Sequence, residues 1–424
     1  MTRAIIFSAA LTCATVTGAR AQVVERFEEE ARSPRAGTRI NAIRALVNAG
    51  HPQSAELVAR LLKDADARVQ LEAIDGILSL HLSPAPAATQ AAPLDIRNGS
   101  IAQSVFENLP LSVLPRPVSA NVLSAIESGI SDDDERVRVS AAFALGILAS
   151  PAVAPLGPEA GRALGERLVY AIQKADAPTR EALVRAFGRI YDTPFRTPGP
   201  VVIGDALIAA MNDADLRVRI WAADSLGWLR YERAVQALMD RFEYLRKGDE
   251  AAACLHALAR IGHGSTASQM DAHAADRRGP FRVMALEGLG RIGDMKAIPT
   301  ITAALNGTRD EAVLVAGAFA LHRLGQARNL DAVIAGLGRP STQRQAQAYL
   351  TELGSVIAPT LHSWLRHEQL AMRQAVAEVI GLTGDKGSED ALRAATRDAN
   401  RAVAEAARQA LMRIRELPSG VRVH

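Results

Sequence analysis

The sequence contains only two cysteines, Cys13 and Cys254, and few aromatic residues: nine Phe, five Tyr and three Trp among 424 residues. Strands favour aromatic and β-branched side chains, whereas Ala and Leu favour helices. A chain with 4% aromatic and 48% hydrophobic residues is therefore more typical of closely packed helices than of a β-sandwich. Lysine is also scarce, so that 44 of the 49 basic residues are Arg, which we attribute to a coding bias.

The sequence also lacks a strong excess of charge and a long apolar run. The formal net charge is +3, and Arg3 and Arg20 in the first 21 residues contribute two of these charges. Nucleic-acid-binding domains concentrate basic residues on one surface, so this composition argues against nucleic acid as a partner. No run of 18 apolar residues follows residue 21, so we expect no transmembrane helix in the mature chain.

The first 21 residues have the features of a secretory signal peptide. Arg3 precedes an apolar run over residues 4–16, and Ala19 and Ala21 stand at the two positions that a signal peptidase reads. We expect cleavage after Ala21 and export of the mature chain, which begins at Gln22, to the periplasm or the extracellular space. Cleavage leaves one cysteine, so no internal disulfide can form.

An amphipathic helix of a recurring type is clearest in residues 213–229. Val218, Ala222, Leu226 and Leu229 have the spacing of one helix face. Asp215 stands where its carboxylate can accept from the free amides of the first turn. Such a helix cannot bury its apolar face alone, and variants of it, each preceded by a shorter apolar helix, recur along almost the whole chain.

Alignment of these variants on Gly227 shows a repeat. From Gly188 onward the aligned positions are 29 to 39 residues apart, a period typical of a solenoid. The eleven aligned positions are Val47, Leu78, Gly146, Gly188, Gly227, Ala259, Gly290, His322, Thr351, Gly381 and Met412. The residue before each is bulky and apolar, and the residue five before it is Ala, Gly or Cys in nine of eleven cases. Cys254 lies in the second of these columns, so we interpret it as a small buried hydrophobic residue.

This pattern resembles HEAT repeats, in particular the short HEAT-like class named after phycobilisome lyases. The best match is residues 289–305, which read Leu-Gly-Arg-Ile-Gly-Asp-Met-Lys-Ala-Ile-Pro-Thr-Ile-Thr-Ala-Ala-Leu. The segments Asp-Glu-Arg-Val-Arg ending at Arg138 and Asp-Leu-Arg-Val-Arg ending at Arg219 also match. The resemblance covers about residues 36–415 and implies an all-α fold, an α-solenoid superhelix of about eleven antiparallel helix pairs. We therefore assign residues 22–415 to one HEAT-like domain.

A Pro-rich insertion at about residues 83–118 interrupts the regular spacing. Six prolines in this stretch are incompatible with a regular helix pair, so we expect a long excursion with one short helix near residues 101–108. Pro-rich links at residues 150–158 and 193–200 also follow the second helix of a pair. All three are expected to leave the array along one edge, where either binding or neutral insertion is accommodated. Residues 416–424 are expected to form a frayed tail.

The sequence contains no recognisable catalytic motif. It has no Gly-rich phosphate loop, no Gly-x-Ser-x-Gly and no His-Glu-x-x-His. The nearest approach to a metal-ligand set is Cys254, His256, His263, Asp271, His273 and Asp276, whose spacing fits no familiar zinc site. Deoxyhypusine hydroxylase, which is built from similar repeats, holds two irons with paired His-Glu motifs, whereas this chain has His367-Glu368 alone. We predict no catalytic residues, no metal and no cofactor.

One column of the repeat suggests a binding surface. The residue after the aligned position is Arg189, Trp228, Arg260, Arg291 or Arg323 in five successive repeats, and Trp221 shares the same helix face. In HEAT solenoids the second helix of a pair lines the concave side. An Arg ladder with tryptophans on that side suits an acidic, extended peptide. The alternative is that these arginines complement helix dipoles and keep the surface soluble.

A second Arg column lies eight residues before the aligned position and is interpreted as structural. It comprises Arg39, Arg138, Arg180, Arg219, Arg282 and Arg373. In HEAT-type repeats such an Arg commonly pairs with an Asp of an adjacent repeat, because a partly buried guanidinium needs a fixed acceptor. Asp66, Asp134 and Asp215 are candidates for this pairing or for helix caps.

These observations predict a non-catalytic protein-binding scaffold or adaptor of the bacterial cell envelope that uses the concave face of the solenoid. The partner is expected to be a protein or an extended peptide. A metal-dependent oxidoreductase or a lyase-like enzyme on the same scaffold is the alternative, and stoichiometric iron or zinc in the purified protein would distinguish it.

Overall fold

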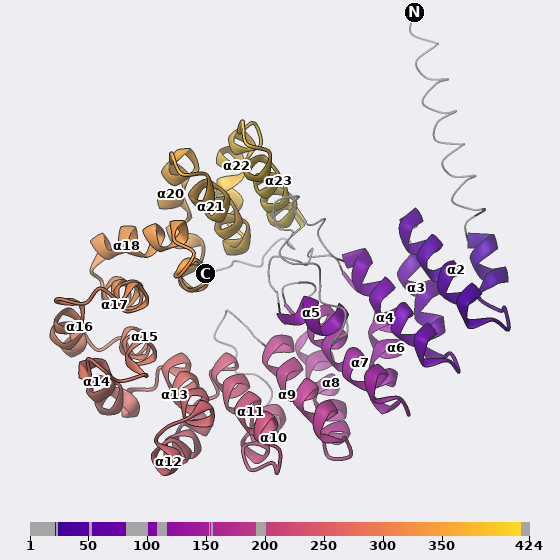
Figure 1. The fold of residues 1–424 in the computed structure, drawn as a ribbon, viewed down its shortest axis with the longest axis horizontal. Helices are drawn as coiled ribbons and strands as arrows, with labels where there is room; N and C mark the ends of the chain where they lie inside the picture. Colours follow the sequence, from indigo (N-terminus) through magenta and orange to yellow (C-terminus); the bar gives the residue numbers. More distant parts are fainter. Residues whose placement is uncertain are drawn as a thin grey trace, which may run out of the picture.

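The computed structural model describes residues 22, 24–50, 53–81, 101–107, 117–151, 153, 156–191 and 201–416, and all regular structure in these ranges is helical. The helices stack as antiparallel pairs into a curved superhelix that closes most of a ring (Figure 1). The predicted α-solenoid is therefore confirmed. The expected signal peptide at residues 1–21 lies outside the described residues. So does the expected tail at residues 416–424, apart from Glu416, which is the last residue of the final helix.

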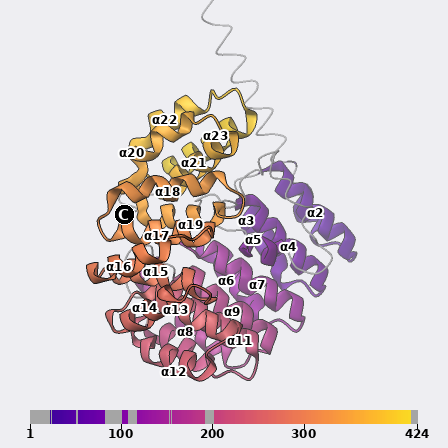
Figure 2. The same ribbon diagram turned by 60° about the vertical axis from the view of Figure 1, so that its left-hand side comes forward.

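The second helix of each pair lies on the inside of the curve, and its first helix lies outside (Figure 1). Figure 2 shows the same pairs as one continuous band from the first to the last. The inner helices are α2 (Ala36–Ala49), α4 (Ala67–His81), α7 (Glu135–Leu148), α9 (Ala177–Ile190), α11 (Leu216–Trp228), α13 (Asp249–Ile261), α15 (Arg282–Ile292), α17 (Glu311–Arg323), α19 (Gln343–Leu353), α21 (Leu370–Thr383) and α23 (Arg401–Glu416). Each of the eleven positions aligned in the sequence lies in one of these helices.

Most outer helices are shorter than their inner partners, although α8 is not, and many are extended by a 3₁₀ turn. They comprise a helical segment at residues 24–30 and α3 (Ser54–Ala59), α6 (Ala120–Ser128), α8 (Pro158–Ile172), α10 (Val201–Ala210), α12 (Val235–Leu245), α14 (Ala267–Ala275), α16 (Ile298–Leu305), α18 (Leu330–Ala335), α20 (Ala358–Leu361) and α22 (Glu389–Ala395). The described residues thus contain eleven pairs. Their buried apolar side chains form one continuous core that runs from Phe27 to Ile414.

Successive inner helices approach each other most closely at the aligned glycines. A Cβ atom on Gly227 would lie 2.7 Å from Cα of Ala257 in the next inner helix, and one on Gly290 would lie 2.6 Å from Cα of Ala320. The small column five residues earlier faces the outer helix of its own pair instead, since a Cβ on Gly317 would meet the side chain of Leu305. Two small columns therefore set two different helix contacts.

Two aspartates precede several inner helices. One of them caps the helix and the other pairs with an Arg of the adjacent repeat, which are the two roles that the sequence left open. Asp215 caps α11, because its carboxylate accepts from the amides of Arg217 and Val218, as predicted. Asp213, two residues earlier, accepts both guanidinium bonds of Arg180 in the preceding pair, at 2.7 and 2.9 Å. The second Asp of an Asp-x-Asp segment thus caps its own helix, and the first binds the neighbouring repeat.

The structural Arg column connects each pair to the next along much of the array. Arg39 pairs with Asp64, Arg138 with Asp176, Arg180 with Asp213, Arg219 with Glu250 and Arg373 with Asp398. Most of these arginines also donate to a carbonyl in the turn of their own pair, as Arg180 does to Ala175. Arg282 differs, since it donates to the carbonyls of Ala274 and Ala304. Each guanidinium therefore joins two turns, which fixes the rotation of one pair relative to the next.

The Pro-rich insertion supplies one further helix, α5 (Ile101–Glu107), where the sequence predicts a short helix. This helix packs on the inside of the curve against α7 (Figure 1). Ala102, Val105 and Phe106 are buried there. The reason is steric: Gly146 on α7 leaves a slot that the Phe106 ring fills, because a Cβ on Gly146 would lie 2.8 Å from that ring. Most of the rest of the insertion, for which the sequence predicts a path along one edge of the array, lies outside the described residues.

Candidate functional site

Three of the six predicted binding residues form one stack on the concave side. The guanidinium of Arg189 lies 5.2 Å from the Trp228 ring centre, and that of Arg260 lies 3.6 Å from it. The three side chains come from α9, α11 and α13 and are half-buried. An indole that contacts two guanidinium groups gains cation–π attraction from both. We call Arg189, Trp228 and Arg260 the inner stack.

Trp221 lies beside the inner stack but belongs to a different contact. Its ring is 4.1 Å from the guanidinium of Arg185, which is also 5.0 Å from the Phe143 ring and only 5% exposed. Sequence reasoning missed Arg185. Its position in the repeat could have indicated it. Arg185 lies three residues before Gly188, as Asp224 lies three residues before Gly227, so both belong to one column of the inner face.

A series of hydrogen bonds through Asp224 and His256 holds the side chains of Trp228 and Arg260 in place. Trp228 donates its indole N–H to Asp224 at 3.0 Å, and Asp224 is also 3.0 Å from Nδ1 of His256. Nε2 of His256 accepts from Arg260 at 3.2 Å, so Nδ1 carries the proton that is donated to Asp224. Burial acts to raise the pKa of Asp224, but the bond from His256 and the nearby charges lower it below its ordinary value, so the carboxylate is ionised at neutral pH.

Arg260 is the exceptional member of the inner stack. Among the residues that the structure describes, it contacts Trp228 and His256 but has no carboxylate within ion-pair distance. Burial lowers its pKa, and the charges of Asp224, Glu287 and Glu352 compensate only in part. A half-buried guanidinium of this kind is stabilised by any carboxylate that a ligand brings to it.

Arg291 and Arg323 are engaged in a neighbouring ion cluster instead. Arg291 is 6% exposed and binds Glu352 with two bonds, at 3.0 and 2.9 Å, as well as Glu287 at 3.0 Å. Arg323 lies 3.5 Å from Glu352, and Arg230, at the end of α11, lies 3.4 Å from it. We call Arg230, Glu287, Arg291, Arg323 and Glu352 the Glu352 cluster.

The Glu352 cluster ties four inner helices together. Burial acts to raise the pKa of Glu352, but Arg291 and the other arginines lower it to about 2. Burial acts to lower the pKa of Arg291, but its two acidic partners, Glu352 and Glu287, raise it above its ordinary value. Glu352 stands in the same sequence column as Arg260, Arg291 and Arg323, so the sequence held the signal, but an acid breaks the Arg pattern by which that column is recognised.

An aromatic pair supports the Glu352 cluster. The Tyr349 hydroxyl donates to Glu287, and its ring stacks on Phe319 with 4.2 Å between the ring centres. Gln345 donates to the Tyr349 hydroxyl at 2.8 Å. The acceptor oxygens of Glu287 are thereby divided between Tyr349 and Arg291, which fixes the carboxylate without a ligand.

Asp75 on α4 lies in the same inner column as Asp224 but has a different electrostatic environment. Burial, together with the charge of Glu72, raises its pKa to about 7 from 3.8. A raised carboxyl pKa means that ionisation costs the folded state free energy as pH rises from about 4 to about 7. We expect Asp75→Asn to be as stable as wild type near pH 4 and on the order of 1–2 kcal/mol more stable at pH 8. Urea unfolding at both pH values measures this.

The matched control for Asp75 is Asp133→Asn, which changes an exposed aspartate in the turn before α7. We expect it to leave the pH dependence of unfolding unchanged. A difference between Asp75→Asn and wild type that is the same at pH 4 and pH 8 would show that Asp75 ionises normally.

The residues considered as metal ligands lie apart and have other contacts. Cys254 is buried in α13, and burial raises its pKa to about 12. His263 accepts from the amide of Ser265 in a turn, and His273 packs edge-on against Phe242 and Phe281. Within the described ranges, no three His, Cys, Asp or Glu side chains are grouped so as to hold a metal ion. No helix in those ranges is both long and apolar enough to cross a bilayer.

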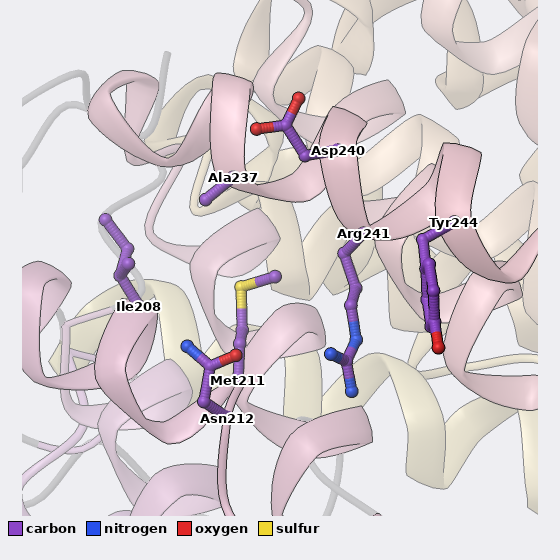
Figure 3. Close-up of a pocket in the computed structure, with 7 residues that line it drawn as sticks. All are labelled: Ile208, Met211, Asn212, Ala237, Asp240, Arg241 and Tyr244. Carbon is purple, nitrogen blue, oxygen red and sulfur yellow. The ribbon is translucent and has the colours of Figure 1, made fainter.

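The outer side carries a shallow groove between α10 and α12. Its lining residues are Ile208, Met211, Asn212, Ala237, Asp240, Arg241 and Tyr244 (Figure 3). Arg241 is engaged with Glu250 at 2.6 Å, and Tyr244 at one end is 82% exposed. The groove has one acid and one paired base, so it offers less charge for recognition than the inner face does.

Comparison with known proteins identifies the repeat. The family model for HEAT repeats matches residues 165–259, and the model for the PBS lyase HEAT-like repeat matches residues 281–307. Both agree with the resemblance seen in the sequence. Among curated proteins none matches the chain.

Solved structures show similarity of fold alone. Yeast importin-beta (Kap95p) aligns with 93% of this chain and 57% of its own length, at 13% identity and a TM-score of 0.53. An engineered protein aligns over 93% of this chain and 99% of its own, at 18% identity and a TM-score of 0.33. The CpcE–CpcF phycocyanin lyase complex from Nostoc sp. PCC7120 aligns over 68% and 86%, at 20% identity and a TM-score of 0.31.

Proposed function

We propose that this chain, a HEAT-repeat solenoid, is a non-catalytic scaffold of the bacterial cell envelope that binds an acidic segment of a partner protein on its concave face. The observation that carries the proposal is Arg260, a half-buried cation stacked on Trp228 that has no carboxylate partner among the described residues. An acidic side chain of a partner would complete this site with a charge-assisted hydrogen bond.

The neighbouring groups suit the inner stack to recognition. Trp228 offers a large rigid ring, and Trp and Arg are over-represented among the residues that dominate binding energy at interfaces. Arg189 contacts the same ring, with its guanidinium 5.2 Å from the ring centre. Arg291 and Arg323, in contrast, neutralise Glu352, so we assign them to holding the face in shape rather than to direct binding.

The location in the envelope rests on the sequence. The basic start, the apolar run and the small residues at Ala19 and Ala21 support export. The mature chain contains one cysteine, so it needs no disulfide formation after export.

Capture with the mature chain, residues 22–424, tests the proposal. Wild-type protein on a resin is exposed to envelope extract and, separately, to cytosolic extract of the source cells, and retained proteins are quantified. We expect a partner from the envelope extract whose retention falls at least tenfold with Arg260→Gln, which removes the cation. We expect a similar loss with Trp228→Phe, which weakens the cation–π contact and removes the indole N–H that binds Asp224.

The chain offers matched controls for both substitutions. Arg278→Gln changes an exposed arginine in an outer turn, and Trp364→Phe changes the tryptophan that lies on the outer side. Both controls should retain the partner as wild type does. Equal retention by Arg260→Gln and wild type, or retention from the cytosolic extract alone, would overturn the proposal.

A further inference from the structure

The concave face already holds one short helix, and that helix comes from an insertion rather than from a repeat. Helix α5 has seven residues and packs against α7 inside the curve (Figure 1). Seven residues are too few to form a stable helix in isolation, so α5 depends on the surface that it covers. What it presents to that surface therefore shows which side chains the inner face selects.

The contacts of α5 are made by an aromatic residue and the acid that follows it. The Phe106 ring lies 5.0 Å from the Phe143 ring and 5.4 Å from each of the guanidinium groups of Arg185 and Arg189. The carboxylate of Glu107 pairs with Arg185 at 3.2 Å. Phe106 thereby extends the inner stack by one ring, since Arg189 contacts Phe106 as well as Trp228.

Helix α5 does not satisfy all the hydrogen-bond donors of Arg185. Arg185 is 5% exposed, and its Nε–H has no hydrogen-bond partner among the described residues. Glu107, by contrast, is 48% exposed and bonds to one nitrogen of Arg185. Glu181, which lies in α9 with Arg185, is 3.5 Å from another of its nitrogens. A buried N–H that is left unsatisfied has lost its hydrogen bonds to water without replacing them, which destabilises the folded chain. A carboxylate placed slightly deeper than that of Glu107 would bind Arg185 with two parallel bonds and remove this destabilisation.

We propose that α5 occupies, within the chain, a binding site for a short helix of a partner protein that carries an aromatic residue followed by a carboxylate, and that the partner helix displaces α5. The proposal rests on the proposed function and names the chemistry of the partner. The selective elements are the slot at Gly146, the rings of Phe143 and Trp221, and the guanidinium of Arg185. A partner with a better-placed carboxylate outcompetes α5 because it satisfies Arg185 fully.

The probe for this proposal is the α5 sequence itself. A fluorescent peptide of residues 98–110 is titrated, with anisotropy as the readout, into the full mature chain as wild type and as Phe106→Ala/Glu107→Gln, which frees the site. We expect at least tenfold tighter binding to the double variant, because α5 competes with the peptide in wild type. The peptide that carries Phe106→Ala serves as the matched control and should bind at least tenfold more weakly.

Adding Arg185→Gln to the double variant should abolish peptide binding. Equal binding of the peptide to wild type and to the folded double variant, or no binding to either, would overturn the proposal. Unfolding of the double variant, seen by circular dichroism, would also overturn it, because α5 would then be a fixed part of the core. Retention of a partner through Arg260 and Trp228 is measured separately, so failure at Arg185 and failure of the proposed function are distinguishable.

Discussion

Replacing Glu352 by alanine is expected to lower the free energy of unfolding by about 3–5 kcal/mol, since it leaves Arg291 buried without its main partner. Arg291 is 6% exposed and holds Glu352 with two bonds, and the remaining acid, Glu287, also accepts from Tyr349. The variant also removes the acceptor shared by Arg230 and Arg323. Urea unfolding of the mature chain at pH 7 measures the loss, and Glu368→Ala, at an exposed acid before α21, should change stability by less than about 0.5 kcal/mol.

The pH dependence of stability provides a second test of the same carboxylate. The pKa of Glu352 is about 2 in the folded chain and 4.5 ordinarily. A depressed carboxyl pKa contributes stability that is fully present above about pH 5 and is lost as pH falls through 2. The stability difference between wild type and Glu352→Gln should therefore shrink between pH 5 and pH 2. A difference that stays constant over this range would show that Glu352 is not held ionised by the arginines.

A double substitution separates the ion pair from the general effect of mutation. Arg291→Met and Glu352→Met are each expected to be strongly destabilising, because each leaves a buried charge behind. The double variant has neither charge of this ion pair. Its loss of stability should therefore be smaller than the sum of the two single losses by about 1–3 kcal/mol. Additive costs would show that the two side chains do not interact.

The second large effect is expected at Gly290, where two inner helices touch. A Cβ there would lie 2.6 Å from Cα and 2.9 Å from Cβ of Ala320, so α15 and α17 must separate to admit it. We expect Gly290→Ala to cost about 2–3 kcal/mol even though alanine favours helices, and Gly290→Val to cost more. Thermal unfolding measures the loss, and small-angle scattering should report a more open superhelix.

Gly37 on α2 is the matched control for this prediction. It is exposed and lies in a helix, and a Cβ atom added to it would have no neighbour within 4 Å. Gly37→Ala should therefore gain about 0.5–1 kcal/mol from helix propensity alone. If Gly290→Ala were as stable as Gly37→Ala, the close approach of the two backbones would not limit the curvature of the array.

The sequence predicts the array well because each repeat solves the same packing problem. Apolar side chains at helical spacing, a small residue where helices approach and Asp at the helix start recur in one alignment, and all eleven aligned positions lie in inner helices. The pattern lies within each repeat and recurs in the others, so a repeat that matches it poorly can still be assigned from its alignment with the rest.

Contacts between repeats were less accessible from the sequence. Each Asp-x-Asp segment contains two aspartates, and either could pair with the Arg of the preceding repeat. Asp213 and Asp215 are the same residue type, so the sequence does not show which of them forms the ion pair. The geometry of the turn decides it. Glu352 binds Arg230, which is 122 residues away, only because the superhelix curves tightly enough to bring α11 and α19 together. Such pairs depend on the global curvature, which no single repeat encodes.

The position of α5 was also not accessible from the sequence. The Pro-rich composition and the short apolar segment at residues 101–107 predict a helix within an insertion, but not the surface on which it packs. That surface depends on the absence of a side chain at Gly146 and on Arg185 and Arg189 from the next inner helix. An insertion has no repeat partner from which its docking could be read.

The most direct test of the central claim, that the concave face is the binding surface, is hydrogen–deuterium exchange of the mature chain with and without its captured partner. We predict slower exchange at the C-terminal turns of α9, α11 and α13, which carry Arg189, Trp228 and Arg260, with no change in α10 and α12. Slower exchange confined to α10 and α12 would instead place the partner in the outer groove of Figure 3 and would contradict the account.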